Sequence, residues 1–357
     1  MENMNFKVCI SCRTYNHVEY IQSALEGFVS QKTDFPYVCV ICDDASNDGE
    51  SDFLQKYFNT NFVEGKVLSD EDAVITFGKH VHNPNCYFVL VLLNYNFYSI
   101  KKSKEKFLEP WLNNSKYFAI CEGDDFWISE NKLQMQVDFL DHNEDYSACL
   151  TKFNKYLSCS KKYIGMGGSV RETIQDMLWK DVDFGTATFA CRTALYKEYL
   201  SDIHPEKQDW LMGDKPLFLY MGYRGKVKML PVITSVYRIL DSSASHSSDI
   251  NLQVKRARNT IDIYHFFARR YLNEDSLWFN KIEGGFLYRV YLFYKDCKQR
   301  LPYEYRSKIL SYQGKYYKLY VVKLFLIIPG LDNIIYGLVK IKDKMVFKFN
   351  KLKGICG

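Results

Sequence analysis

The sequence lacks the features that would place it among membrane-spanning or secreted proteins. Its apolar segment Val321–Pro329 falls far short of the roughly 18 residues that cross a bilayer. The first residues, Met1–Asn5, are polar and have no apolar signal core. The 11 cysteines are scattered singly, without the spacing of a disulfide framework. We therefore expect a cytoplasmic protein that folds in a reducing environment.

Two cysteine pairs have Cys-x-x-Cys spacing, Cys9/Cys12 and Cys39/Cys42. Both lie in apolar runs typical of strands, where residues three apart point to opposite faces. Neither pair could bind one zinc ion without breaking its strand. We interpret all four thiols as core residues.

Charge is distributed unevenly along the chain. The net charge is +5, yet the segment from Lys315 onward has nine lysines and two aspartates, so it carries +7 and the rest about −2. Its lysines alternate with apolar residues and it has no arginine, which argues against nucleic-acid binding. Two interpretations remain: contact with an anionic membrane surface, and a docked helix with a solvated basic face.

Apolar runs and amphipathic stretches alternate in the first part of the chain. We predict strands at 6–12 and 37–42 and helices at 18–29 and 51–58. This order predicts an α/β fold with a parallel sheet and right-handed crossovers, in which ligands bind at the carboxyl ends of strands. Residues 87–93 fit a strand or a buried helix equally well.

Later segments give further expectations. Ser129 is predicted to cap a helix, Gly165–Gly168 to form a flexible loop, and Arg238–His246 to form a serine-rich loop. Long amphipathic stretches at 250–271 and 277–297 predict helices. We expect three parts in the chain: a catalytic domain at 1–247, a helical extension at 248–314, and a basic, apolar tail at 315–357.

An acidic cluster follows a short apolar run at Tyr117–Cys121. Glu122-Gly123-Asp124-Asp125 places three acids within four residues, which costs electrostatic energy unless a cation is near. Mg²⁺ and Mn²⁺ accept oxygen ligands and often need only one or two carboxylates plus substrate phosphates. A turn with solvated acids is the alternative interpretation.

Polar clusters also follow the first two predicted strands, at Arg13–His17 and Asp43–Gly49. Further along, Asp214 stands at or near the start of a helix that Pro216 fits in its first turn. On the residues alone, we favour a helix cap over a catalytic acid for Asp214.

Four blocks in this order resemble the family 2 glycosyltransferases, inverting enzymes of the GT-A fold, and among them the bacterial enzymes that build surface polysaccharides. The resemblance runs from about Phe6 to His246, with a weak match between about 62 and 116. The blocks are short polar or acidic motifs: Arg13–His17; Cys42–Gly49; Cys121–Trp127 with Lys132–Gln134; and Met212–Leu217 with Val236–Arg238 and Ser243–His246.

The resemblance implies a role for each matching residue. Asp214 would be the general base that deprotonates the acceptor hydroxyl. The cation, Mn²⁺ or Mg²⁺, would be held by Asp125, Asp124 and His246. The residues implied to bind the nucleotide sugar are Arg13, Thr14, Tyr15, Asp43, Asp44, Asp124 and Arg238.

The implied reaction moves a hexosyl or N-acetylhexosaminyl group from a nucleotide sugar, first of all a UDP-sugar, to a hydroxyl of a glycan or lipid-linked glycan. Capsule, O-antigen or other cell-surface polysaccharide synthesis would be the setting, on the inner face of the plasma membrane. Two departures stand out. Glu122 replaces the aspartate of many members, and the small residue–Arg–Asn segment before the acidic motif is missing; Asn94–Tyr98 is a candidate for part of its place.

Three other classes remain open. A sugar-1-phosphate nucleotidyltransferase needs a glycine-rich loop after the first strand, and Arg13–Asn16 has no glycine. A signalling receiver module could place Asp43-Asp44 around Mg²⁺, but it is far shorter than 357 residues. A non-catalytic sugar-binding relative is the third, and the presence of Asp124, Asp125 and Asp214 together argues against it.

Overall fold

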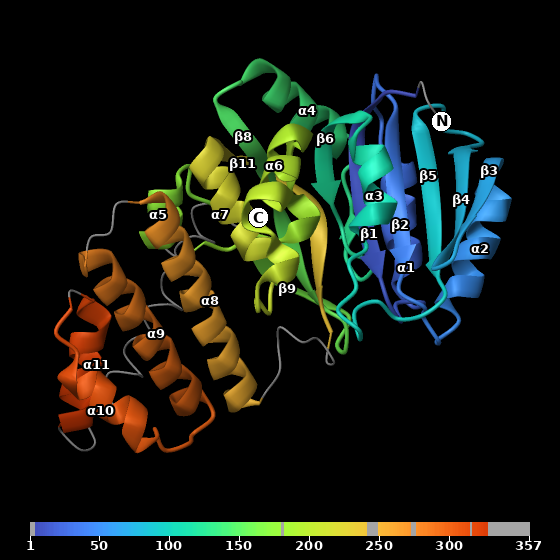
Figure 1. The fold of residues 1–357 in the computed structure, drawn as a ribbon. Coiled ribbons are helices and arrows are strands. Elements are labelled where there is room, and N and C mark those ends of the chain that lie inside the picture. The colour runs from blue at the N-terminus through green and yellow to red at the C-terminus, as the bar shows by residue number, and fades with distance from the viewer. Residues whose placement is uncertain (1–3, 180–181, 241–248, 273–275, 315, 328–357) are drawn as a thin grey trace. The chain divides into compact units, whose positions relative to one another are not determined.

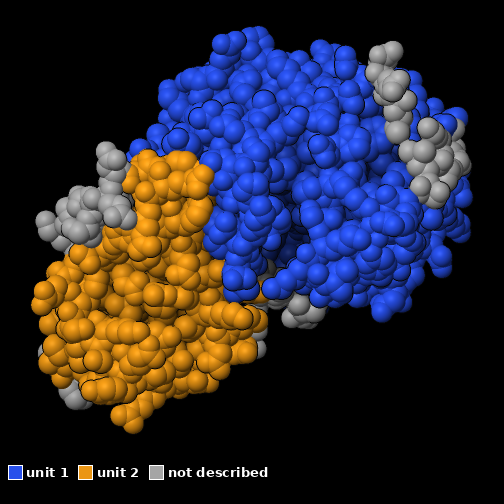
Figure 2. Space-filling view, viewed as in Figure 1, with its two compact units in different colours: residues 1–246 blue, residues 247–357 orange. Residues whose placement is uncertain are grey.

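The computed structural model describes residues 4–179, 182–240, 249–272, 276–314 and 316–327. The chain forms two compact units, residues 1–246 and 247–357 (Figure 2). The first holds one sheet and the helices around it, and the second is helical.

Four neighbouring parallel strands form the centre of the sheet, in the order β5, β2, β1, β6 (Figure 1). These strands are β1 (Phe6–Thr14), β2 (Tyr37–Asp43), β5 (Cys86–Leu93) and β6 (Ser115–Ile120). The predicted parallel sheet is confirmed, and the ambiguous run at 87–93 is a strand. β2 is buried along its whole length, as expected of a strand covered on both faces.

Shorter and mixed pairings extend the sheet on both sides, giving the order β3-β4-β5-β2-β1-β6-β10-β8-β11-β7 with β9 on β8. The added strands are β3 (Phe62–Asp70), β4 (Ala73–His80), β7 (Phe126–Trp127), β8 (Tyr146–Leu157), β9 (Lys162–Gly167), β10 (Ala190–Arg192) and β11 (Lys226–Ile239). β3 and β4 form an antiparallel hairpin at one edge, beside β5.

The loop predicted at Gly165–Gly168 was wrong. Residues 162–167 form strand β9, paired antiparallel with β8. Gly167 faces the ring of Phe153, where an added Cβ would lie 2.2 Å from the ring. The glycine therefore serves close packing of two strands at this position rather than flexibility.

Helices flank the sheet of the first unit. They are α1 (Ile21–Val29), α2 (Glu50–Asn61), α3 (Glu105–Leu112), α4 (Lys132–His142), α5 (Ile174–Trp179), α6 (Thr193–Ile203) and α7 (Asp214–Arg224), with short 3-10 turns η1 (Thr186–Thr188) and η2 (Pro205–Lys207). Ser129 does not cap α4, because the helix begins three residues later, after Asn131. The carbonyl of Ser129 instead accepts a 2.8 Å hydrogen bond from the Gln31 side chain.

The core of the first unit lies between the parallel strands and α1, α2 and α4. All four cysteines of the two Cys-x-x-Cys pairs are buried free thiols, and Cys12 and Cys39 belong to this core. Burial raises the pKa of each of these thiols, which keeps them protonated. They are packing residues, as the strand geometry predicts.

The second unit contains α8 (Ile250–Tyr271), α9 (Ser276–Asp296), α10 (Tyr303–Ser311) and α11 (Tyr317–Ile327). Its small core gathers apolar side chains from all four helices, among them Ile261, Phe286, Val290, Ile309 and Leu319. Within the described ranges, every helix is too short or too polar to cross a membrane. The structure reaches the first residues of the basic tail, up to position 327.

Candidate active site

The loops that follow β1 and β2 are joined by a buried carboxylate that the sequence did not reveal. Glu50, at the start of α2, accepts hydrogen bonds from Thr14 Oγ1 (2.5 Å), the His17 backbone N–H (2.8 Å) and Ser46 Oγ (3.0 Å). Burial raises the pKa of Glu50. Glu50 thus fixes the end of β1 at Thr14 and the loop that follows it.

Asp43 has its partners within its own turn. Its carboxylate accepts a 3.2 Å hydrogen bond from the Ser46 backbone N–H, and others from the hydroxyls of Ser46 and Ser51. These serines surround the acid at the approach to α2. In the structure Asp43 therefore organises the β2–α2 loop.

Asp44 fastens a distant loop to the end of β2. Its carboxylate accepts hydrogen bonds from the backbone N–H groups of Phe97 (2.7 Å) and Tyr98 (3.2 Å) and forms a 2.6 Å ion pair with Lys104. This brings the Asn94–Tyr98 segment to the carboxyl end of β2. It also means that both oxygens of Asp44 already have partners.

Arg13 lies beside Glu105 at the start of α3. Its guanidinium donates to Glu105 Oε1, which also accepts a 3.4 Å hydrogen bond from the Tyr196 hydroxyl. The side chain of Arg13 remains 49% exposed, so it can also meet a ligand. Tyr15, two residues on, is exposed as well.

The acidic loop after β6 is held against the β1 loop by backbone contacts. The N–H of Gly123 donates a 3.1 Å hydrogen bond to the Arg13 carbonyl. A Cβ at position 123 would lie 2.2 Å from Thr14 Oγ1, so glycine alone fits there. This contact sets Glu122–Asp125 next to Arg13–Tyr15.

Arg238 braces the same loop from β11. Its backbone N–H donates to Asp125 Oδ1 (2.8 Å), and its guanidinium donates to the carbonyl of Asp124 (2.8 Å) and to Ser23 Oγ (3.0 Å). The guanidinium also lies 4.4 Å from the centre of the Phe126 ring. The predicted loop at 238–246 is therefore wrong at its start, because Arg238 belongs to a strand.

The acidic loop carries more negative charge than its neighbours compensate. Burial, followed by the charges of Asp124 and Glu122, raises the pKa of Asp125 well above its usual range. Burial also raises the pKa of Glu122 to about 7, and the charges of Asp124 and Asp214 add to this shift. A hydroxyl from η1, that of Thr186, donates a 2.5 Å hydrogen bond to Glu122.

Asp214 is the first residue of α7, and its carboxylate accepts a 2.7 Å hydrogen bond from the Lys215 N–H. Its charge acts on Glu122, so the structure brings this acid, about 90 residues further along the chain, to the acidic loop. His246 lies outside the described residues. The remaining residues that the sequence assigned to the site gather around the ends of β1, β2, β6 and β11.

The donor set of the acidic loop fits a hard divalent cation. Asp124 and Asp125 are adjacent carboxylates whose mutual repulsion a cation would relieve. Over the described part of the chain, no three His, Cys, Asp or Glu side chains form a metal cage. Two carboxylates without a cage are the donor set expected where substrate phosphates complete the shell.

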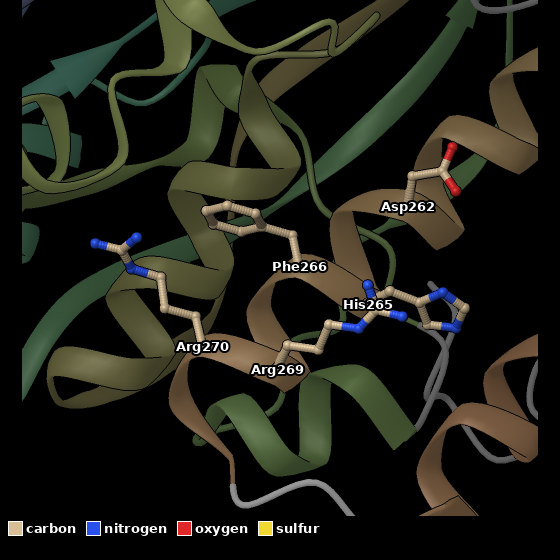
Figure 3. A pocket seen from close by; sticks show the side chains of 5 residues that line it. All are labelled: Asp262, His265, Phe266, Arg269 and Arg270. Atoms are coloured by element: carbon tan, nitrogen blue, oxygen red, sulfur yellow. The ribbon is translucent and has the colours of Figure 1, made fainter.

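A pocket of about 500 Å³ lies along α8 in the second unit. Figure 3 shows its lining, with Phe266 and Arg270 on one side of the helix and Asp262, His265 and Arg269 on the other. None of the residues that the sequence assigned to the site is among these five. Burial lowers the pKa of His265, whose Nε2 atom is buried without a hydrogen-bond partner.

No family model matches the chain. Among curated proteins it is similar to the uncharacterized proteins Rv1520 of Mycobacterium tuberculosis and Mb1547 of Mycobacterium bovis. Each is 24% identical over 229 residues, which are 63% of this chain and 56% of the relative. The chain thus spans about half the length of these relatives.

The fold is the GT-A fold, the class that the resemblance implied. Residues 1–349 of S. aureus TarS, solved in complex with UDP, match with a TM-score of 0.52 at 16% identity, over 85% of this chain and 78% of that one. The mannosyltransferase PcManGT from Pyrobaculum calidifontis, solved with GDP-Man and Mn²⁺, matches with a TM-score of 0.44 at 16% identity, over 90% and 88% of the two chains. At 16% identity, the match to TarS shows the fold alone.

Proposed function

We propose that the protein is a metal-dependent, inverting glycosyltransferase that moves a sugar from a nucleotide donor to an acceptor hydroxyl. The observation that carries the proposal is the meeting of two separate sequence blocks. The charge of Asp214, the acid at the start of α7, contributes to the raised pKa of Glu122 in the acidic loop. Acids gathered at the carboxyl edge of a parallel sheet fit a reaction on a phosphorylated ligand.

The donor would bind between the β1 loop and the acidic loop. Arg13, half exposed and oriented by Glu105, supplies a cation for the nucleotide, and exposed Tyr15 supplies an aromatic face. Asp43 and Asp44 contribute by holding the surrounding loops in place. UDP is the nucleotide we favour, because TarS, the neighbour whose fold matches, was solved with UDP.

The cation, Mn²⁺ or Mg²⁺, would be held by Asp124 and Asp125, with His246 as the further ligand that the sequence suggests. When bound, such an ion neutralises charge on a diphosphate leaving group. Gly123 and Arg238 fix the backbone of the acidic loop and so position the two carboxylates that would hold the ion.

Asp214 would accept the proton of the acceptor hydroxyl as its oxygen attacks the anomeric carbon. The C–O bond to the acceptor forms as the bond to the nucleotide diphosphate breaks, so a single displacement inverts the configuration. The Lys215 N–H holds one carboxylate oxygen of Asp214 and leaves the other for the acceptor.

We propose a hexosyl or N-acetylhexosaminyl donor and a glycan or lipid-linked glycan acceptor, in the synthesis of a cell-surface polysaccharide such as capsule or O-antigen. The work would take place in the cytoplasm, at the inner face of the plasma membrane. Support for the membrane part comes from the +7 charge of residues 315–357.

The decisive experiment screens nucleotide sugars with Mn²⁺, reading donor hydrolysis and thermal stabilisation. One donor should be hydrolysed by the wild type. Asp125→Ala should lose this activity and the Mn²⁺-dependent stabilisation, whereas Asp214→Asn should keep the stabilisation and lose about 10²–10⁴-fold in the rate of donor hydrolysis, in which water takes the place of the acceptor. Full turnover by either variant, or hydrolysis of no donor, would count against the proposal.

A further inference from the structure

One face of α11 is apolar and exposed. The side chains on it are 39 to 72% exposed: Tyr317, Tyr320, Val321, Leu324 and Ile327. At 3.6 residues per turn these five positions fall within an arc of about 120°. Every side chain within this arc is apolar or aromatic.

The opposite side of α11 packs against the rest of the second unit, which holds the helix in place. Leu319 and Val322 are buried in the core of the second unit, with Phe325 and Leu326 packed against it. The helix therefore packs on the core of the second unit through its buried side, and its exposed apolar face takes no part in that packing. A contiguous apolar stripe of this size on a soluble unit marks a surface for a partner.

The charges around the face indicate what the partner is. Lys318 and Lys323 stand on either side of the apolar arc, and the residues from 315 onward carry +7. Tyrosines on the face suit the boundary between headgroups and acyl chains, where one end of a side chain is apolar and the other wet. An apolar stripe flanked by lysines is the pattern of a helix that lies in the plane of an anionic membrane.

We propose that the apolar face of α11 inserts into the surface of an anionic lipid bilayer, with Lys318 and Lys323 beside it at the level of the headgroups. The partner is thus a lipid surface rather than a second copy of this chain. The inference concerns attachment and stands or falls independently of the reaction at the acidic loop.

The test is sedimentation of the full chain with vesicles of equal parts phosphatidylglycerol and phosphatidylcholine, and with phosphatidylcholine alone. The wild type should bind the anionic vesicles, and less so as salt is raised. The double variant Leu324→Glu/Ile327→Glu should bind at least about tenfold less, because two apolar side chains no longer enter the bilayer.

A matched control changes the same number of charges elsewhere. Val63→Glu/Ile164→Glu alters side chains that are 65% and 53% exposed, close to the 64% and 54% of Ile327 and Leu324. This control should keep most of the binding. Equal loss in both double variants would overturn the proposal, as would equal binding to neutral vesicles or no binding at all. A wild-type dimer that Leu324→Glu/Ile327→Glu converts to monomer, without vesicle binding, would assign the face to a second copy.

Discussion

Gly123 lies so close to Thr14 that a Cβ at position 123 would be 2.2 Å from the threonine hydroxyl. This contact joins the acidic loop to the end of β1, and it therefore places the carboxylates near Arg13. The hydroxyl is itself tied to buried Glu50, so it cannot swing away freely.

Gly123→Ala should therefore displace the acidic loop or strain the β1 loop. We expect a loss of about 1–3 kcal/mol in the free energy of unfolding, as for other overpacked sites, together with weaker Mn²⁺-dependent stabilisation. Denaturant unfolding measures the first effect and thermal shift the second. Gly213→Ala is the matched control, since a Cβ there meets no atom within 4 Å; equal loss in both variants would contradict the role given to Gly123.

Arg238 gives a second prediction, because it donates hydrogen bonds to Asp124 and Asp125 of the acidic loop. Arg238→Ala should lower both stability and Mn²⁺ affinity, by about 2–3 kcal/mol in unfolding free energy, since the Asp124 carbonyl loses its charged donor. Arg238→Lys should restore little, because an ammonium cannot supply the two-sided fork that reaches Asp124 and Ser23. If Arg238 acted only on the diphosphate, the alanine variant would raise the donor KM and leave the unfolding curve unchanged.

The ion pair between Asp44 and Lys104 is suited to a double-mutant cycle. Asp44→Asn and Lys104→Met should each destabilise the protein, and the cycle should give a coupling of about 1–3 kcal/mol for this largely buried pair. A coupling near zero would show that the loop at 97–104 is held by other contacts. Lys197→Met, which breaks only a contact with Asn113, serves as the control and should change little.

The burial of Lys132 leads us to predict that the free energy of unfolding depends on pH. Its ammonium is buried, 2.6 Å from Gln136 Oε1 and 4.1 Å from the Trp127 ring centre, and burial lowers its pKa to about 7. Between pH 7 and the ordinary lysine value of 10.5 the unfolded chain binds the extra proton, so the stability due to this group should rise with pH over that window.

Lys132→Met should flatten this rise and stabilise the protein at pH 7 by about 1–2 kcal/mol. Urea unfolding from pH 6 to 10 makes the comparison, with exposed Lys162→Met as the control. If the difference in stability between the wild type and Lys132→Met did not change with pH across this window, the assignment of the buried charge would be refuted.

Regular elements of both units could be predicted because each of them follows a single local pattern in the sequence. Strands β1, β2 and β6 are short apolar runs that stop at polar residues, and α8 is a long amphipathic pattern whose bounds match the prediction. The hairpin β3–β4 could not be predicted, because its stability comes from pairing with β5 and its sequence shows little alternation. Likewise the glycines at 165–168 indicated a loop, whereas the structure has a strand there, because Gly167 packs closely against the ring of Phe153.

In the candidate site, too, some residues could be predicted from the sequence and others could not. The acids of the motifs were visible as clusters, and the structure gathers them around the ends of the strands. The residues that hold them were not visible: Glu50, Glu105 and Lys104 are ordinary helix or loop residues in the sequence. Their importance arises from partners 36, 92 and 60 residues away, which no local pattern can reveal.

The salt link from Lys104 to Asp44 has a consequence for which part of a ligand goes where. The ion pair compensates the charge of Asp44, whereas Asp43 keeps its charge among the hydroxyls of Ser46 and Ser51. The carboxylates of Glu122, Asp124 and Asp125 crowd together in the acidic loop, where the charges of Asp124 and Glu122 add to the effect of burial on Asp125. An anionic group would therefore approach this loop most readily together with a cation.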